Sequence, residues 1–137
     1  MLTGLEHIGI AVEHLDLSIE LWLKLTGGRL VHREIVAEQR VEVAVIEVGS
    51  LRIELLCATD DDSAIARFLK TRGPGIHHVA LHSTAAQEDL NRLKAAGVGL
   101  IDEKFRSGAE GARIGFLHPR ATGGVLVEVV ERGGDQA

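Results

Sequence analysis

Aromatic residues are scarce in this sequence, which has 137 residues but no tyrosine, one tryptophan and three phenylalanines. Because proteins often bind single-stranded nucleic acids by stacking bases on aromatic rings, this scarcity disfavours such a function. Positive charge is also limited, since 15 Lys and Arg are set against 20 Asp and Glu and leave a net charge of −5. An acidic chain repels the phosphate backbone, so duplex DNA or RNA is excluded as an expected partner.

Cysteine is almost absent as well, because Cys57 is the single thiol in the chain. One cysteine cannot form an internal disulfide. No apolar run approaches the length of about 18 residues that a membrane-spanning helix needs, and the first residues lack the basic and apolar segments of a signal peptide. We therefore expect a cytoplasmic protein that binds neither a membrane nor nucleic acid.

The sequence can form an aliphatic core, since 45% of its residues are hydrophobic. It also contains one apparent duplication. The stretches 6–12 and 51–56 each have a counterpart later in the chain, at 77–81 and 125–130. The separation between His7 and His78 is nearly equal to that between Glu54 and Glu128, which is typical of a repeated unit. The length fits one domain.

Hydrophobic periodicity and turn residues predict the same order of elements, strand, helix and three strands, in both halves. The expected strands are 6–12, 30–35, 41–48, 51–57, 77–82, 98–101, 113–118 and 125–130, and the expected helices are 16–25, 64–70 and 85–96. Asp16 is the expected N-cap of the first helix, and Leu17, Leu21 and Leu25 belong to its predicted apolar stripe together with Ile19 and Leu23. The modules are expected at about 1–72 and 73–132, within one domain.

Side-chain alternation places four polar residues on one predicted face. Residues i and i+2 of a strand share a face, so His7 and His78 point away from the bulky aliphatic residues that should pack on the helices. Glu54 and Glu128 are likewise opposite to their aliphatic neighbours. A purely structural role does not explain this agreement, although Arg52 could pair with either glutamate.

Two imidazoles and two carboxylates form a ligand set that suits one divalent metal ion such as Co, Mn, Ni, Zn or Mg. A single histidine in an apolar strand is commonly a structural residue. Glutamates in such strands are different, because a buried carboxylate without a partner costs several kcal/mol. We therefore predict a metal site made of His7, Glu54, His78 and Glu128.

These residues resemble the vicinal-oxygen-chelate superfamily, which includes glyoxalase I, extradiol dioxygenases and resistance proteins, and within it the methylmalonyl-CoA epimerase family. The resemblance covers nearly the whole chain. The segments that carry it are Glu6-His7-Ile8-Gly9-Ile10-Ala11-Val12, Gly75-Ile76-His77-His78-Val79-Ala80, Phe116-Leu117-His118-Pro119-Arg120 and Gly123-Gly124-Val125-Leu126-Val127-Glu128.

The resemblance implies an α+β fold in which two tandem βαβββ modules form a curved, cup-shaped mixed sheet around a divalent metal. It also implies a metal-dependent epimerase that interconverts the (R) and (S) forms of methylmalonyl-CoA through a metal-stabilised enolate. Inversion requires an acid–base group on each side of that intermediate. Glu128 is the candidate for one side, and Glu42 or Glu38 for the other, although Val43 stands where some epimerases have the second acid.

Other functions stay open at this stage. Another metal-dependent member of the superfamily, a glyoxalase I-like lyase or a dioxygenase, would use a similar site, and a non-catalytic resistance or binding protein would sequester a ligand. For the epimerase, the expected partner is an acyl-CoA substrate whose phosphates could contact Lys104, Arg113 or Arg120. We also expect a homodimer, because small modules of this kind commonly cover their sheet edges with a second copy.

Overall fold

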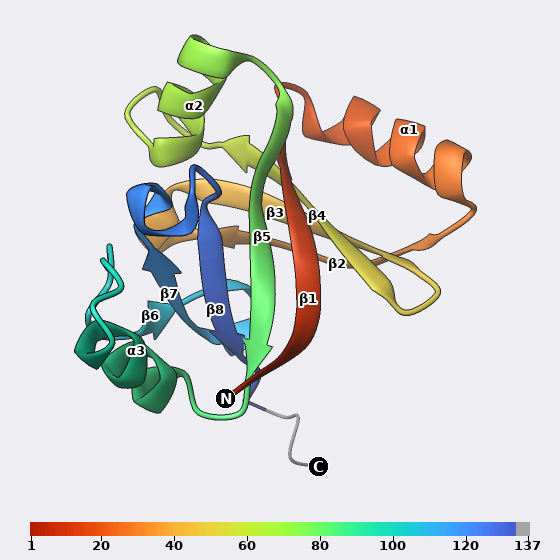
Figure 1. Ribbon diagram of the computed structural model, residues 1–137. Helices are drawn as coiled ribbons and strands as arrows, with labels where there is room; N and C mark the ends of the chain where they lie inside the picture. Colours follow the sequence, from red (N-terminus) through yellow and green to blue (C-terminus); the bar gives the residue numbers. More distant parts are fainter. Residues whose placement is uncertain (134–137) are drawn as a thin grey trace. The chain divides into compact units, whose positions relative to one another are not determined.

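A computed structural model describes residues 1–133 and contains two successive βαβββ arrangements, which Figure 1 colours from red to blue along the chain. The first comprises β1 (Leu2–Ala11), α1 (Leu15–Thr26), β2 (Arg29–Val36), β3 (Val41–Val48) and β4 (Leu51–Ala58). The second, after the connecting helix α2 (Ala64–Arg72), comprises β5 (Gly75–Ser83), α3 (Ala86–Ala95), β6 (Arg106–Ser107), β7 (Arg113–Leu117) and β8 (Val127–Glu131).

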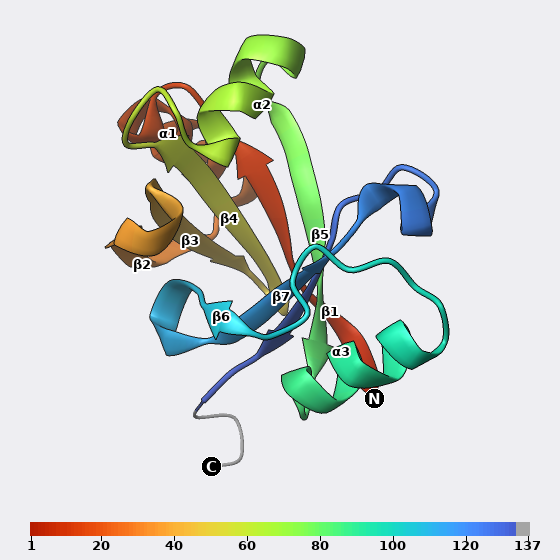
Figure 2. The same cartoon turned by 90° about the vertical axis from the view of Figure 1, so that its left-hand side faces the viewer.

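The first module has the strand order β2-β3-β4-β1, and Figure 2 shows β2, β3 and β4 side by side. β1 and β4 are parallel, whereas β2, β3 and β4 are joined as antiparallel neighbours. Gly49, at φ +60°, makes the tight turn between β3 and β4. Glycine takes this left-handed conformation with little steric cost, which explains why the turn of the hairpin lies at Gly49.

The second module repeats this topology with the strand order β5-β8-β7-β6. β5 and β8 are parallel, and β8, β7 and β6 are antiparallel neighbours. The two compact units of the fold are residues 7–77 and residues 78 onward together with residues 1–6. Within the latter unit, the hydroxyl of Thr3 lies 2.7 Å from Nδ1 of His82.

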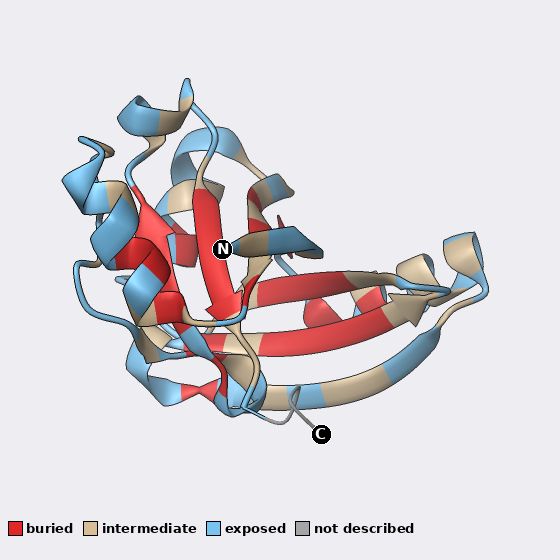
Figure 3. Ribbon diagram, turned by 60° about the horizontal axis from the view of Figure 1, so that its bottom comes forward, coloured by how far each residue is buried: buried red, intermediate tan, exposed pale blue. Residues whose placement is uncertain are grey.

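The core of the first module lies between its sheet and α1. Ile10, Ile53 and Leu55 pack with Leu15 and Ile19 of the helix, and all five are buried. The buried segments of the strands are red in Figure 3. Each fully buried aliphatic side chain of this size contributes about 1.5–3 kcal/mol relative to exposure. The predicted alternation is therefore confirmed for this module, since the aliphatic face is the one that the helix covers.

The second module has apolar side chains on both faces of its sheet. Val127 and Val129 pack with Ala86 and Leu90 on the side of α3. On the other side lies a second cluster, made of Ala80, Ala112, Ile114, Phe116 and Val130. This second cluster shares its face with Glu128, because paired residues and residues two apart along a strand point to the same side.

Two local expectations are wrong. Asp16 does not cap α1, since His14 holds the N-cap position and Asp16 lies in the first turn of the helix. Residues 98–101 form no strand, because only Leu100 makes a single bridge, to Leu117. The strand that pairs with β7 is instead the two-residue β6, further along the chain.

The predicted apolar stripe of α1 is only partly buried in the structure. Ile19 faces the core, whereas Leu17, Leu21 and Leu25 remain 64%, 53% and 63% exposed. Residues at this spacing of four lie on one helix face, so the helix presents a second, uncovered apolar face. Among the described residues, no helix combines the length and the apolar character needed to cross a membrane.

Candidate metal centre

The first histidine and glutamate of the predicted ligand set meet in the first module. Nδ1 of His7 lies 3.2 Å from Oε2 of Glu54, and the two side chains are only 3% and 6% exposed. The parallel pairing of β1 with β4 places Glu54 opposite Gly9, two residues after His7 and on the same face. Gly9 has no side chain that could separate the imidazole from the carboxylate.

The second histidine and glutamate lie side by side in the second module, although here the histidine contacts the carboxylate through Nε2 instead of Nδ1. Nε2 of His78 lies 3.1 Å from Oε1 of Glu128, and these side chains are 4% and 7% exposed. β5 and β8 are parallel, and Glu128 pairs with Ala80, two residues after His78. The ring of Phe116 lies edge-on to the imidazole of His78, with the ring centres 5.6 Å apart.

The two pairs are equivalent in register as well as in residue type. In both modules the glutamate stands opposite the residue two positions after the histidine, and that residue is small, Gly9 or Ala80. In both modules the pair also lies on the sheet face that the module's own helix leaves uncovered. A duplicated unit that keeps its ligands explains all three features.

The chemistry of each pair fits a hard or borderline divalent cation. Two donor atoms that each lie about 2.1 Å from one ion, at right angles, are separated by about 3 Å. The N–O distances of 3.2 Å for His7–Glu54 and 3.1 Å for His78–Glu128 match that requirement. Imidazole nitrogen and carboxylate oxygen are ligands for Co, Mn, Ni or Zn, and the carboxylate also for Mg. Each pair therefore offers one nitrogen and one oxygen ligand.

Glu42, one of the candidate acid–base residues, lies on the other face of the first module. It pairs with Cys57, whereas Glu54 pairs with Val45, three positions further along β3. Odd spacing along a strand reverses the face, so Glu42 points to the side of α1. Its Oε2 accepts a hydrogen bond of 2.9 Å from Nε of Arg33. Glu42 is thus directed away from His7 and Glu54.

The salt bridges of Arg33 fix Glu42 in this orientation. Nη1 of Arg33 donates to Oδ1 of Asp16 on α1, at 2.7 Å, so the guanidinium joins β3 to the helix. The hydrogen bonds to Glu42 and to Asp16 raise the pKa of Arg33. This contact argues against an acid–base role of Glu42, because its carboxylate is engaged on the helix side of the sheet.

Glu38, the other candidate, lies in the short 3₁₀ helix Ala37–Gln39 between β2 and β3, where its side chain is exposed. The next residue but one, Arg40, has a φ of +53°. Its guanidinium donates to Oδ2 of Asp60 and to the carbonyl of Asp62. The connection that carries Glu38 is thereby tied to the loop after β4.

Comparison with known proteins assigns the family. The family model described as Glyoxalase/Bleomycin resistance protein/Dioxygenase superfamily matches residues 6–116. The chain belongs to this superfamily. The resemblance seen in its sequence motifs is confirmed, and so is the expected α+β fold built from two βαβββ modules.

Within the superfamily, the chain is similar to methylmalonyl-CoA epimerases. It is 32% identical to the human mitochondrial methylmalonyl-CoA epimerase, over 91% of this chain and 72% of that protein. The crystal structure of methylmalonyl-CoA epimerase from Mycobacterium tuberculosis has a TM-score of 0.94 and 40% identity, covering 98% of this chain and 91% of that one. A methylmalonyl-CoA epimerase in complex with methylmalonyl-CoA and NH4+ also has a TM-score of 0.94, with 34% identity and coverage of 98% and 97%.

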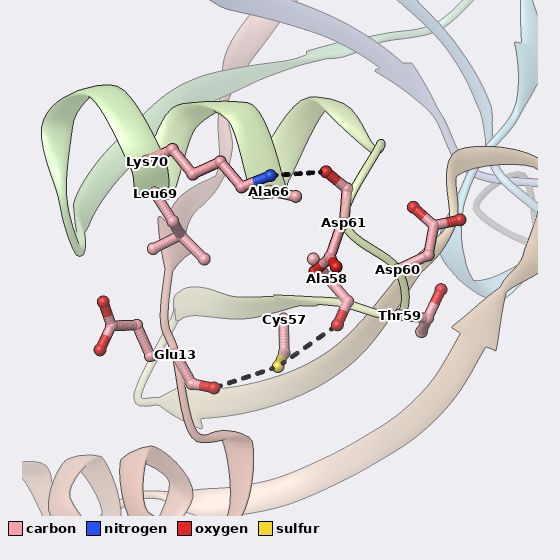
Figure 4. Close-up of a pocket in the computed structure, with 9 residues that line it drawn as sticks. All are labelled: Glu13, Cys57, Ala58, Thr59, Asp60, Asp61, Ala66, Leu69 and Lys70. Atoms are coloured by element: carbon pink, nitrogen blue, oxygen red, sulfur yellow. Dashed lines mark hydrogen bonds between the residues drawn. The ribbon is translucent and has the colours of Figure 1, made fainter.

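A cavity of about 300 Å³ lies elsewhere in the first module, between the end of β4 and α2 (Figure 4). Glu13, Asp60 and Asp61 line it together with Lys70, whose ammonium group donates to the carbonyl of Asp61. The excess of carboxylates disfavours the phosphates of a coenzyme A ester. Burial raises the pKa of the Cys57 thiol in its wall, which disfavours the thiolate form.

The basic residues that could contact coenzyme A phosphates are all exposed. Lys104 and Arg113 flank β6, and Arg120 lies in the 3₁₀ helix Pro119–Thr122. The guanidinium carbon of Arg113 lies 4.9 Å from the ring centre of Phe105, which holds its head group in place. These residues stay candidates, since exposed cations of this kind are frequent on protein surfaces.

Sequence reasoning missed a further group in the second module. The guanidinium carbon of Arg106 lies 5.6 Å from the ring centre of Phe116, which in turn contacts His78. Asp102 completes the group through its salt bridge to Arg106. No periodic signal could have revealed it, because Arg106 belongs to a strand of only two residues.

Proposed function

We propose that this chain is a metal-dependent epimerase that interconverts the (R) and (S) forms of methylmalonyl-CoA. The observation that carries the proposal is the repeated, buried His–Glu pair, at 3.2 Å in one module and 3.1 Å in the other. It occurs in a chain whose similarity to methylmalonyl-CoA epimerases extends over more than nine-tenths of its length. The presence of both His–Glu pairs in such a chain supports the same chemistry here.

His7 and Glu54 from the first module, and His78 and Glu128 from the second, are proposed to hold one divalent ion. Such an ion supplies positive charge beside oxygens on which negative charge develops. The low exposure of all four side chains supports this role, because a dry site strengthens electrostatic interactions. Co, Mn, Ni, Zn and Mg are the candidate metals.

The reaction inverts the carbon that lies between a carboxylate and a thioester. Its proton is weakly acidic because the negative charge left behind spreads over the neighbouring carbonyl oxygens as an enolate. A base removes the proton from one side, and an acid returns a proton from the other. Each group must lie within hydrogen-bond reach of that carbon.

Glu128 is proposed as the group on one side, as the sequence resemblance implies. For the other side, the orientation of Glu42 toward Arg33 and α1 disfavours it, whereas Glu38, on the exposed connection between β2 and β3, stays a candidate. The equivalence of the two modules favours Glu54, which is related to Glu128 by the repeat and shares its burial. We therefore assign proton transfer to Glu54 and Glu128, one from each module.

Hydrogen exchange provides the test of the epimerase. Methylmalonyl-CoA is incubated with metal-loaded protein in deuterated water, and loss of the α-proton is followed by NMR. We expect exchange that disappears with a chelator and in His7→Ala, whereas His14→Ala, which removes an exposed imidazole, keeps the wild-type rate. Absence of exchange in the metal-loaded wild type would contradict the proposal.

The alternatives give different results in parallel assays. A glyoxalase I-like lyase, favoured by the paired Glu54 and Glu128 ligands and by the family model, would form lactoylglutathione from the hemithioacetal of methylglyoxal. A dioxygenase would consume oxygen with Fe(II). A ligand-sequestering protein would bind no divalent ion at all, which metal analysis of the purified protein reveals.

We also propose that the chain forms a homodimer and is located in the cytoplasm. The exposed face of α1 that carries Leu17, Leu21 and Leu25 supports self-association, because contiguous apolar surface is usually covered. Light scattering after size-exclusion chromatography should give the mass of two chains. The substitution Leu21→Glu should shift the mass toward one chain, whereas Glu20→Lys, at an exposed neighbouring position, should leave it unchanged.

A further inference from the structure

Arg106 lies on the same sheet face as the His78–Glu128 pair. In the antiparallel pairing of β6 with β7, Arg106 stands opposite Ile114, and Phe116 of β7 stands opposite Glu128 of β8. Directly paired residues share a face, as do residues two apart. One face of this module therefore presents, from edge strand to β5, a guanidinium, an aromatic ring, a carboxylate and an imidazole.

Phe116 connects the guanidinium of Arg106 with the imidazole of His78. Its ring centre lies 5.6 Å from the guanidinium carbon of Arg106 and 5.6 Å from the ring centre of His78. A cation at this distance is attracted to the ring. The head group of Arg106 is thus held one aromatic ring away from a proposed metal ligand.

Asp102 fixes the Arg106 side chain from its other end. Its Oδ1 lies 3.3 Å from Nε of Arg106, and its Oδ2 accepts a hydrogen bond of 2.9 Å from the backbone N–H of Phe116. The same carboxylate therefore anchors both the arginine side chain and the backbone of Phe116. Such support reduces the side-chain entropy that a ligand must overcome to order the guanidinium.

The two terminal nitrogens of Arg106 make no hydrogen bond to any residue that the structure describes. Its ion-pair partner among these residues is Asp102, and the contact between them is at Nε. The side chain is 35% exposed. Arg132 is different, since its terminal nitrogens contact Glu6, Glu110 and the carbonyl of Ala109.

We propose that Arg106 binds the free carboxylate of the substrate's acyl group, an inference that rests on the proposed epimerase function. Two terminal N–H groups in a planar fork match the geometry of a carboxylate. The phosphates of coenzyme A fit this place less well, because the long pantetheine arm separates them from the thioester. The acyl group is the part of the substrate that must lie beside the ligand pair next to Phe116. Arg106 then selects acyl-CoA esters that carry a second carboxylate.

Two ligands that differ only in this carboxylate test the role of Arg106. Methylmalonyl-CoA and propionyl-CoA are titrated by calorimetry into metal-loaded wild type, Arg106→Met, Arg106→Lys and Arg113→Met. We expect Arg106→Met to weaken methylmalonyl-CoA binding about 10- to 100-fold, as for a lost hydrogen bond to a charged group. The affinity for propionyl-CoA should change less than about twofold. Arg106→Lys should give an intermediate loss, because an ammonium keeps the charge without the fork.

Arg113→Met is the matched control. Arg113 is also stacked on a phenylalanine, but it precedes Ile114 and so lies on the opposite face of β7. Its replacement should affect both ligands by the same factor, whether or not it contacts phosphate. Equal weakening of both ligands in Arg106→Met, or a wild type that does not prefer methylmalonyl-CoA, would overturn the inference.

Failure of the inference and failure of the proposed function remain distinguishable. If wild type exchanges the α-proton but Arg106→Met keeps the preference for methylmalonyl-CoA, the assignment of Arg106 is wrong and the epimerase stands. If wild type shows no exchange but loses its preference on Arg106→Met, the carboxylate-binding role stands and the epimerase is wrong. Thermal unfolding of each variant separates both results from a folding defect.

Discussion

The two modules hold the same His–Glu pair in different surroundings. In the first, Glu54 stands opposite Val45 of β3, and the neighbouring Val43 is also buried. In the second, Glu128 stands opposite Phe116, with Arg106 stacked on that ring. Duplication has thus kept the imidazole, the carboxylate and their register, while the adjacent strand has diverged. We infer that both modules serve metal binding, and that the second is specialised for an anionic group of the substrate.

The largest expected effect comes from exchanging each glutamate for its amide. If Glu54 and Glu128 act from opposite sides, Glu128→Gln should abolish α-proton exchange of one enantiomer of methylmalonyl-CoA and Glu54→Gln that of the other. Each loss should be about 100-fold or more, as for removal of a general base. NMR in deuterated water, started from each pure enantiomer, measures both rates.

Glu38→Gln and Glu42→Gln are the controls for that experiment. Both should exchange the two enantiomers at wild-type rates, since Glu38 is exposed and Glu42 is bound to Arg33 on the other face. The metal content of every variant is measured in parallel, because the amide oxygen of glutamine can still ligate. Loss of exchange for one enantiomer in Glu38→Gln would instead make Glu38 the second acid–base residue.

The cores of the two modules should respond alike to cavity formation. Leu55 in the first module and Leu90 in the second are both fully buried. Replacement of either by alanine should lower the free energy of unfolding by about 2–5 kcal/mol. Ile76→Ala, at a 65% exposed position, should change it by less than about 1 kcal/mol. Urea titration followed by circular dichroism measures each value, and a large difference between the two modules would contradict their structural equivalence.

A smaller effect is expected at the start of the connecting helix. The hydroxyl of Ser63 caps α2 by accepting a hydrogen bond of 3.1 Å from the backbone N–H of Ala66. Ser63→Ala should lower the free energy of unfolding by about 1 kcal/mol. Ser63→Thr keeps the hydroxyl and should recover part of this loss. A neutral Ser63→Ala would mean that the cap is not formed in solution.

The smallest effect concerns a pH dependence confined to the second module. Burial opposes ionisation of Asp89, but hydrogen bonds from Ser83 and from the amino terminus outweigh it and lower the pKa of this carboxyl. A lowered pKa in the folded state stabilises the protein above the unfolded value, about 3.9, and this contribution disappears as the pH falls through the folded pKa. Asp89→Asn should therefore be destabilising at pH 7, and its effect should shrink as the pH falls through the folded pKa.

Glu88→Gln serves as the control, because it changes an exposed carboxyl one residue earlier in α3. Its effect on thermal unfolding should be small at both pH values. If Asp89→Asn lowers the unfolding temperature as strongly at pH 3 as at pH 7, the buried carboxylate is not the source of the stabilisation.

Much of the fold follows from the sequence because its signals are local. Alternation with a period of two placed His7, His78, Glu54 and Glu128 on the face away from the helices, and the structure has them there. The order of strands and helices followed from glycine turns and periodicity. Periodicity does not predict the pairing register of the parallel strands. In the structure this register is the same in both modules, because the glutamate pairs with the residue two positions after the histidine, as expected for a duplicated unit.

The sequence by itself determined the duplication, the faces of the strands and the pairs of ligand types, since these depend on residue identity and spacing along the chain. Tertiary structure decided what surrounds each pair. Glu42 of β3 is bound by Arg33 of β2, which in turn binds Asp16 of α1. Arg106 contacts the ring of Phe116 from β6, a strand too short to show a hydrophobic period. Contacts between distant segments leave no periodic trace in a single sequence, so packing alone fixes them.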